Sequence, residues 1–225
     1  MSVAVLADIV GSRSLPDRAA AQRTLDATIG EVEQMLGLPV QALRPTVGDE
    51  QQAVFDELHE AMAFTLLLQL SLPEGLECRF GLGIGEVREV ESSTATLSDG
   101  SGWWAAREAI ETVHAMQQRR TPRARAWIVA GSDEDEHVHA LADISNAYLL
   151  ARDELLGTMN ARTRRLTRGR CLGLTQRELA LAEGITQPAV SQALAASGAA
   201  AVVEGFAALR RTALRHASSR DQATP

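Results

Sequence analysis

The chain has 225 residues, 45% of them hydrophobic, and a formal net charge of −7 at pH 7. This length suits one large domain or two small ones with a real core, and no run of about 18 uncharged apolar residues predicts a transmembrane helix. The N-terminus enters a strand directly, so no signal peptide is expected. Because Cys78 and Cys171 lie far apart, we expect reduced thiols in a cytoplasmic protein without membrane insertion.

The charge is unevenly distributed along the chain. Residues 1–160 carry 12 arginines against 25 acidic residues, a net −13, whereas residues 161–225 carry 10 against 4, a net +6. A basic C-terminal part on an acidic body predicts that only this part meets a polyanion. All 22 basic residues are arginine, which excludes a lysine Schiff base and a lysine phosphate ligand.

The apolar periodicity predicts an α+β domain over residues 1–132. Residues 3–10 form a buried strand that only Asp8 interrupts. The elements expected after it are a helix to residue 36, a hairpin of 40–47 with 51–55, a helix over 58–72, a glycine-rich strand over 78–90, a loop or short hairpin over 92–101, a helix over 103–120 and a strand over 126–130. This β-α-β-β-α-β order, followed by α-β, predicts a ferredoxin-like sheet with one added unit.

Two aspartates stand out in this domain. A lone carboxylate in an apolar strand is costly unless something compensates it, and Asp8 is such a group. Asp49 falls at the hairpin tip, so the two aspartates on adjacent strands could hold one or two divalent cations through oxygen ligands. Alternatively, Asp8 caps the next turn and Asp49 is an ordinary turn residue. Gly11, Ser12 and Arg13 could add a phosphate-facing loop.

Two further patterns allow more than one interpretation. Gly81, Gly83 and Gly85 alternate on their strand, so either a helix packs closely on that face or a nucleotide or neighbouring strand needs the room. Trp103 and Arg107 lie four residues apart on a predicted helix and share a face. A tryptophan there could stack on a base while the arginine contacts a phosphate. Alternatively, both neighbouring tryptophans cover the sheet and the arginine pairs with a nearby acid.

Four motifs carry a resemblance to known families. Residues 7–12 (Ala-Asp-Ile-Val-Gly-Ser), 48–50 (Gly-Asp-Glu) and 79–85 (Arg-Phe-Gly-Leu-Gly-Ile-Gly) resemble the motif series of class III nucleotidyl cyclases, over roughly residues 1–130. Together with residues 99–109, which fit Asp-Gly-x-x-(aromatic)-x-x-Arg-Glu-Ala, the whole chain resembles the SatD family of bacterial proteins.

The cyclase resemblance implies a palm-type, ferredoxin-like fold and a metal-dependent nucleotide site. Mg²⁺ or Mn²⁺ would be held by Asp8, Asp49 and the backbone oxygen of Ile9. Arg107 matches a transition-state arginine, but Trp103 stands where cyclases carry asparagine, which departs from the pattern.

The remaining nucleotide predictions follow from the same motifs. Asp99 joins the predicted nucleotide- or phosphate-binding residues. The lysine that selects adenine in cyclases is absent, so any base is recognised in another way.

The remaining chain is predicted to be helical, with a connecting segment over 133–173, a helix-turn-helix domain over 174–217 and a flexible tail over 218–225. The helix-turn-helix resembles that of many bacterial regulators. Thr175 and Glu178 fit a capping box, Gly184 fits the turn and Thr186 caps the second helix.

This segment predicts DNA binding. Arg164 and Arg165 would contact phosphates, and the second helix would contact bases through Thr186, Gln187, Ala189, Ser191 and Gln192. Because one such motif covers a half-site, a homodimer is expected. Alternatively, the motif serves as a protein-interaction module.

The sequence therefore predicts a DNA-binding transcriptional regulator whose cyclase-like domain binds a nucleotide or a metal-phosphate ligand. The alternatives are a metal-dependent nucleotidyl cyclase or nucleotidyltransferase with an accessory helix-turn-helix, and a non-catalytic protein-interaction module.

Overall fold

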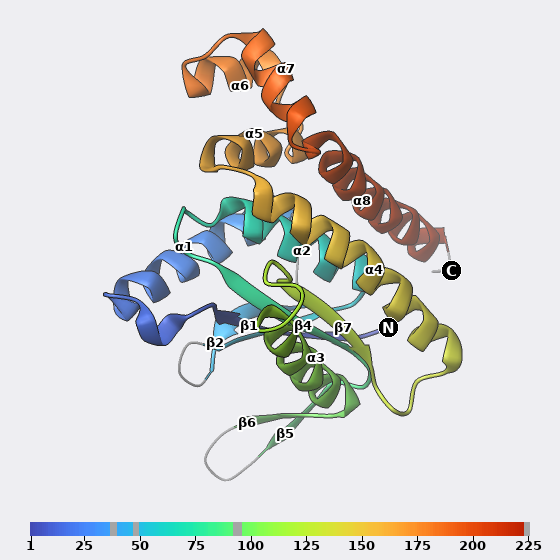
Figure 1. Ribbon diagram of the computed structural model, residues 1–225. Helices are drawn as coiled ribbons and strands as arrows, with labels where there is room; N and C mark the ends of the chain where they lie inside the picture. Colours follow the sequence, from blue (N-terminus) through green and yellow to red (C-terminus); the bar gives the residue numbers. More distant parts are fainter. Residues whose placement is uncertain (37–39, 47–49, 92–95, 223–225) are drawn as a thin grey trace.

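A five-stranded mixed sheet forms the centre of the protein (Figure 1). The computed structural model describes residues 1–36, 40–46, 50–91 and 96–222. The strands, in the spatial order β2-β3-β1-β4-β7, are β2 (Gln41–Pro45), β3 (Gln51–Phe55), β1 (Val3–Ile9), β4 (Cys78–Ile84) and β7 (Ala126–Ala130). β1 is antiparallel to β3 and β4, while β4 is parallel to β7. The predicted ferredoxin-like order with one added unit is confirmed.

Helices cover both faces of the sheet. Alternate residues of β1 point to opposite faces. Val3 and Val5 join a core cluster with α1 (Arg18–Leu36) and α2 (Leu58–Ser71). Ala4 and Leu6 join a second, smaller cluster with α3 (Ser101–Gln117). Asp8, the next residue in the second series, therefore lies on the α3 face of the sheet.

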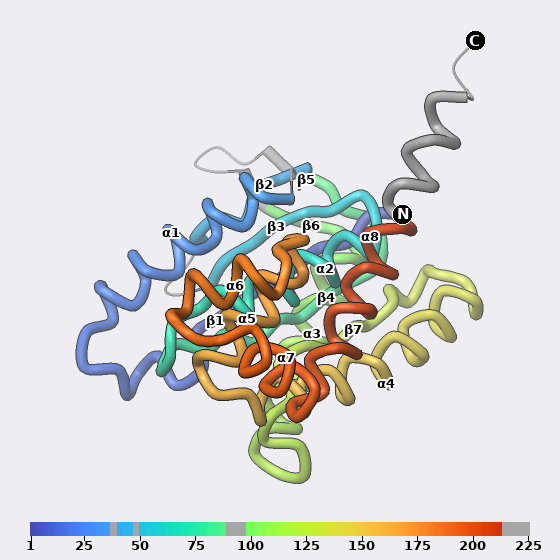
Figure 2. The backbone as a smooth tube through the Cα atoms, turned by 90° about the horizontal axis from the view of Figure 1, so that it is seen from above, coloured from blue at the N-terminus to red at the C-terminus, as the bar shows by residue number. Residues whose placement is uncertain are grey.

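A second helical layer explains why α2 is apolar on all sides. Residues Leu58 and Ala61 to Leu70 of α2 are all buried. One side of α2 packs on the sheet, and the other packs on α5 (Ala161–Cys171) and α8 (Ala199–Gln222). Seen from above, α5, α6 (Gln176–Glu183) and α7 (Gln187–Ala196) lie between α1 and α4 (Glu136–Thr158) (Figure 2). A helix enclosed in this way has no solvent-facing polar stripe.

The free edge of β7 is covered by α4 (Glu136–Thr158). Asn146 accepts a hydrogen bond from the Ile128 N–H and donates one to the Ile128 carbonyl, each 2.8 Å long. Asp153, seven residues later on the same helix, accepts from the N–H groups of Arg125 and Ala126 at 2.6 and 2.9 Å. These side chains form hydrogen bonds with backbone groups at the sheet edge that could otherwise pair with another strand.

The predicted strand over 78–90 is wrong in its length. β4 ends at Ile84, and β5 (Arg88–Glu91) pairs with β6 (Thr96–Asp99) in a separate hairpin. The start of α3 holds the chain at the point where it leaves the sheet. The Gly102 N–H donates to the Glu86 carbonyl at 2.9 Å, and the Glu86 N–H donates to Ser101 Oγ at 3.0 Å.

The predicted helix caps in the C-terminal part are confirmed. α6 (Gln176–Glu183) opens with the Thr175–Glu178 capping box and ends at Gly184 in the left-handed conformation. Thr186 caps α7 (Gln187–Ala196) by accepting from the Ala189 N–H.

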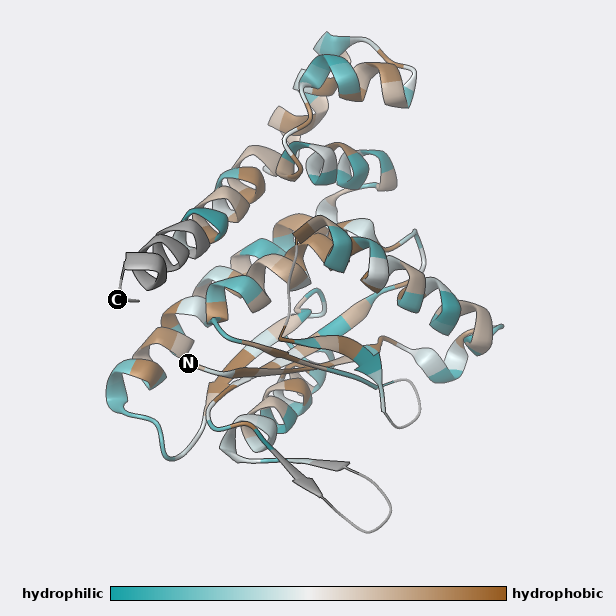
Figure 3. Cartoon of the chain, turned by 180° about the vertical axis from the view of Figure 1, so that it is seen from behind, coloured by the Kyte–Doolittle hydropathy of each residue, from teal (hydrophilic) through white to brown (hydrophobic). Residues whose placement is uncertain are grey.

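A separate C-terminal domain is not shown. Residues of α5 to α8 belong to the same core cluster as the α2 side of the sheet. Figure 3 shows brown, hydrophobic residues both in the sheet with α2 and along the C-terminal helices. α8 also continues to Gln222, through most of the predicted tail. Among the described residues, no single helix is long and apolar enough to span a membrane. In the same part of the chain, one helix pair, Gln187–Ala196 and Ala199–Thr212, has the length and apolar composition of a span only when its two helices are taken together, and it is bent by 82° between them.

Candidate functional site

The carboxylate of Asp8 has a charged partner on the neighbouring strand. Asp8 stands opposite Arg79 in the β1–β4 ladder, and Arg79 Nε donates to Asp8 Oδ1 at 2.5 Å. The Arg79 side chain is 9% exposed and that of Asp8 is 29% exposed. This ion pair therefore compensates the charge that interrupts the apolar strand.

Arg79 is in turn positioned by the C-terminal end of α3. Its Nη1 donates to Gln117 Oε1 at 3.1 Å, and Gln117 Nε2 donates to the Ala124 carbonyl at 2.7 Å. The guanidinium thus bridges the end of β1 and the end of α3.

A second acid stands beside Asp8. Ala7 pairs with Gln51 in the β1–β3 ladder, so Glu50 continues that register next to Asp8. Arg107 of α3 holds Glu50 with two hydrogen bonds, Nη1 to Oε2 at 2.5 Å and Nη2 to Oε1 at 2.8 Å. Such a bidentate pair fixes both side chains.

Charge interactions connect the Asp8–Arg79 pair with the Glu50–Arg107 pair. The hydrogen bonds that Arg107 donates to Glu50 raise the pKa of the Arg107 guanidinium above its ordinary value, although burial opposes this. The charges of Glu50, Glu111 and Asp8 act in the same upward direction. Gln52 and Ser98 extend the polar network, because Gln52 Nε2 donates to Glu50 Oε1 at 3.3 Å and Ser98 Oγ donates to Gln52 Oε1 at 3.2 Å.

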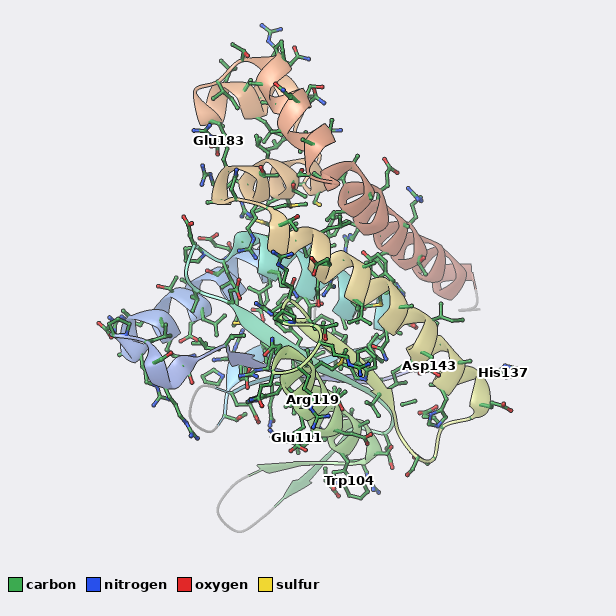
Figure 4. All side chains as sticks on the ribbon, in the orientation of Figure 1. Trp104, Glu111, Arg119, His137, Asp143 and Glu183 are labelled. Atoms are coloured by element: carbon green, nitrogen blue, oxygen red, sulfur yellow. The ribbon has the colours of Figure 1, made fainter. Side chains whose placement is uncertain are left out.

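The structure leaves Trp103 little surface on which a base could stack. Trp103 is 7% exposed and belongs to the core cluster beneath α3. Its neighbour Trp104 is 67% exposed and lies three residues before Arg107, at the solvent side of α3 (Figure 4). The alternative is therefore correct in part, since one tryptophan covers the sheet and Arg107 pairs with an acid.

The alternating glycines serve helix packing. A Cβ on Gly83 would lie 2.0 Å from the Gly102 carbonyl oxygen, and one on Gly81 would lie 2.3 Å from the Ala106 carbonyl oxygen. α3 therefore rests directly on the β4 backbone at this point. This contact brings Arg107 within reach of Glu50.

The other predicted residues lie around this site without joining its contacts. Gly11 precedes a single 3₁₀ turn (Ser12–Ser14), whose Ser14 Oγ donates back to the Gly11 carbonyl at 2.7 Å, and Arg13 is exposed. Within the described chain, no hydrogen bond or ion pair joins Asp99 to Asp8, Glu50 or Arg107.

The predicted metal ligands are placed only in part. Ile9 pairs with Cys78 in the β1–β4 ladder, and Asp49 lies outside the described residues. A cation shared by Asp8 and Asp49 therefore stays a prediction. The described residues contain no group of three or more His, Cys, Asp or Glu residues that could hold a metal ion.

Sequence reasoning missed the partners Glu50, Arg79 and Gln117. One signal was available, because Asp8 and Arg79 are single opposite charges in otherwise apolar strands. Pairing them required the β1–β4 register, which the sequence does not state.

Neither of the two arginines predicted to contact DNA phosphates is both exposed and unpaired. Arg165 holds Glu183 of α6 through two hydrogen bonds of 2.7 Å, and Figure 4 shows Glu183 at the side of α6 nearest α5. Arg164 is half-buried. On α7, by contrast, Gln187, Ser191 and Gln192 are exposed, as are Thr186 and Ala189. DNA binding is not supported by this placement.

The fold and the site together define an α+β protein with a ferredoxin-like strand order and charged residues at one end of its sheet. Among solved structures, a bacterial light-regulated adenylyl cyclase covers 53% of this chain and 71% of its own, with 14% identity and a TM-score of 0.40. The adenylyl cyclase CyaB from P. aeruginosa covers 52% and 81%, with 11% identity and a TM-score of 0.35. A guanylyl cyclase domain from the aquatic fungus Blastocladiella emersonii covers 49% and 74%, with 18% identity and a TM-score of 0.37.

Likeness at these scores carries no information about activity. The chain belongs to the SatD family, whose model matches residues 2–203. No curated protein matches it in sequence.

Proposed function

We propose that the α3 side of the sheet binds a nucleoside triphosphate with Mg²⁺ or Mn²⁺, and that the protein is a metal-dependent nucleotidyl cyclase or nucleotidyltransferase. One observation carries the proposal: Asp8, Glu50, Arg79 and Arg107 meet at one end of the sheet, each acid held by an arginine. Both reactions join a hydroxyl oxygen to the α-phosphorus and expel pyrophosphate, so they need cations around the phosphates.

The donor set fits a hard cation. Mg²⁺ is commonly bound through one or two carboxylates, with the remaining positions filled by phosphate oxygens and water. Asp8 of β1 and Glu50, the residue before β3, supply two carboxylates. The bound cation would stabilise negative charge on the phosphates.

The arginine pairs suggest how the site accepts a ligand. Arg107 is about half exposed and Glu50 mostly covered, so Arg107 can swing to a phosphate without unfolding α3. Glu50 then loses its partner and becomes available to a cation. Trp104, exposed one helical turn before Arg107, offers an aromatic face to a base.

The test is a calorimetric titration of ATP and GTP, each with Mg²⁺ or Mn²⁺, together with measurement of pyrophosphate release. Arg107→Gln removes a charge-assisted contact, so nucleotide affinity should fall about 10- to 100-fold. Asp8→Asn should weaken binding only when the divalent cation is present. Asp143→Asn, at a position on the surface of α4 away from the site (Figure 4), should bind like the parent.

Two results would count against the proposal. If the parent binds neither nucleotide with either cation, the site has another role. If it binds but releases no pyrophosphate, it is a nucleotide sensor and the enzymatic part fails.

DNA binding by α7 is a second candidate, favoured by its exposed polar residues Gln187, Ser191 and Gln192. Phosphate contacts supply most of the affinity of such proteins, and here Arg165 is already paired with Glu183. We therefore rank it below the nucleotide site. A homodimer remains a prediction linked to this candidate.

A further inference from the structure

A pocket lies on the α2 side of the protein, away from the Asp8 site. It has a volume of about 550 Å³ and is enclosed by α1, the end of α2, the loop to β4, and the turn from α4 into α5. This volume is within the range of small-molecule sites. Its lining includes Leu70, Leu72, Pro73, Met159, Arg164 and Arg168.

Arg164 is the unusual residue of this pocket. Its side chain has no hydrogen bond or ion pair to any described residue, and its Nε is buried without a partner. Burial lowers the pKa of the guanidinium, the nearby Arg125 charge adds to this, and Glu77 opposes it. Because arginine nevertheless stays protonated in proteins, the fold holds a half-buried positive charge that has no ion pair with any described residue.

Glu77, the acid whose charge acts on Arg164, already has a partner. Glu77 Oε2 accepts from Arg125 Nε at 3.1 Å and from Arg125 Nη2. Arg164 also lines a smaller cavity of about 20 Å³, with Gln69, whose Nε2 is likewise buried without a partner. A water there would satisfy both N–H groups, but a neutral water leaves the guanidinium charge uncompensated.

The surroundings of Arg164 favour an anion. Arg168 is anchored at the pocket wall, with Nε donating to Ser71 Oγ at 2.8 Å and Nη2 lying 3.8 Å from Glu31. Ala161, the first residue of α5, also lines the pocket, so the positive end of that helix faces the same space.

The other lining residues limit the ligand. Leu70, Leu72, Pro73 and Met159 supply apolar surface, while Glu31 and Glu74 add negative charge that would repel a polyanion. We propose that this pocket binds a small organic molecule with one anionic head group, a phosphate monoester or a carboxylate. Its head group pairs with Arg164 and its apolar or aromatic body lies against the leucines and the methionine.

The experiment uses phenyl phosphate and benzoate as probes, with benzamide as the neutral analogue, in calorimetry and thermal unfolding of the full chain. At least one anion should bind saturably and raise Tm, and benzamide should not. The stronger anion identifies the head group. Arg107→Gln should bind both probes like the parent, which separates this pocket from the Asp8 site.

Variants of α5 supply the decisive comparison. Arg164→Met should lose at least about tenfold in affinity, and its Tm without ligand should equal or exceed that of the parent, because an uncompensated charge is removed. Arg164→Lys should retain part of the binding. Arg162→Met, on the same helix but outside the pocket, should bind normally.

Three outcomes would overturn the proposal. The first is no anion effect on the parent up to about 10 mM. The second is unchanged affinity in Arg164→Met. The third is a failure of Arg164→Met to fold, because the charge would then be needed by the fold itself.

Discussion

At the scale of single residues, the Asp8–Arg79 pair determines whether β1 can carry a charge. Arg79 is almost fully covered, and its removal takes away the arginine that pairs with the Asp8 carboxylate on an apolar strand. We predict that Arg79→Met lowers the free energy of unfolding by about 1–3 kcal/mol, discounted from a fully buried pair because Asp8 is partly exposed. Urea unfolding measures it.

The matched control is Arg88→Met. Arg88 lies 3.3 Å from Glu86, and both side chains are more than half exposed, so the expected loss is about 0–1 kcal/mol. The double variant Asp8→Asn, Arg79→Met should recover part of the loss. If Arg79→Met and Arg88→Met lost the same free energy of unfolding, the Asp8–Arg79 pair would have no special role.

Some single-residue features could not be derived from the sequence. Trp103 and Trp104 are adjacent and chemically identical, so only the rotation of α3 about its axis decides which one is buried. Asp8 could be recognised as a charge in need of a partner, but Arg79 lies 71 residues away. The strand register that joins them is a property of the assembled sheet.

At the scale of elements, the contact between α3 and β4 determines the geometry of the site. The backbone of α3 packs directly on the backbone of Gly83. An added methyl group would therefore collide with backbone atoms of α3, which cannot move aside as a side chain could. We predict that Gly83→Ala lowers the free energy of unfolding by at least about 3 kcal/mol and weakens nucleotide binding, because Arg107 moves away from Glu50. Chemical denaturation and the titration described above measure the two effects.

Gly30 is the control for this change. It lies inside α1 with nothing within 4 Å of an added Cβ, so Gly30→Ala should stabilise the protein by about 0.5–1 kcal/mol through helix propensity. If Gly83→Ala were as stable as the parent, α3 would not rest on the strand as described.

Element order was predictable because strand and helix periodicities differ, and β7 was predicted with its observed bounds. The break between β4 and β5 was not, since hydrogen bonds from the start of α3 hold the chain there. The covering of β7 by Asn146 and Asp153 was also hidden, because both look like ordinary polar residues of a surface helix.

At the scale of the whole molecule, α2 packs against the sheet on one side and against the C-terminal helices on the other. Phe206 of α8, Leu194 of α7 and Leu166 of α5 belong to the same core cluster as the α2 side of the sheet. In the basic C-terminal part, Arg168 of α5 is bound to Ser71 at the end of α2, which connects α5 to the body of the protein.

A shared core predicts one cooperative transition. In calorimetry the full chain should unfold in a single step, with equal calorimetric and van't Hoff enthalpies. Phe206→Ala should lower the free energy of unfolding by about 3–5 kcal/mol while the single transition is kept, because a buried ring is lost from the common core. Leu181→Ala, at a position 78% exposed on α6, should change it by less than about 0.5 kcal/mol. Two resolved transitions, with only the weaker one shifted by Phe206→Ala, would instead establish the separate C-terminal domain that the sequence predicts.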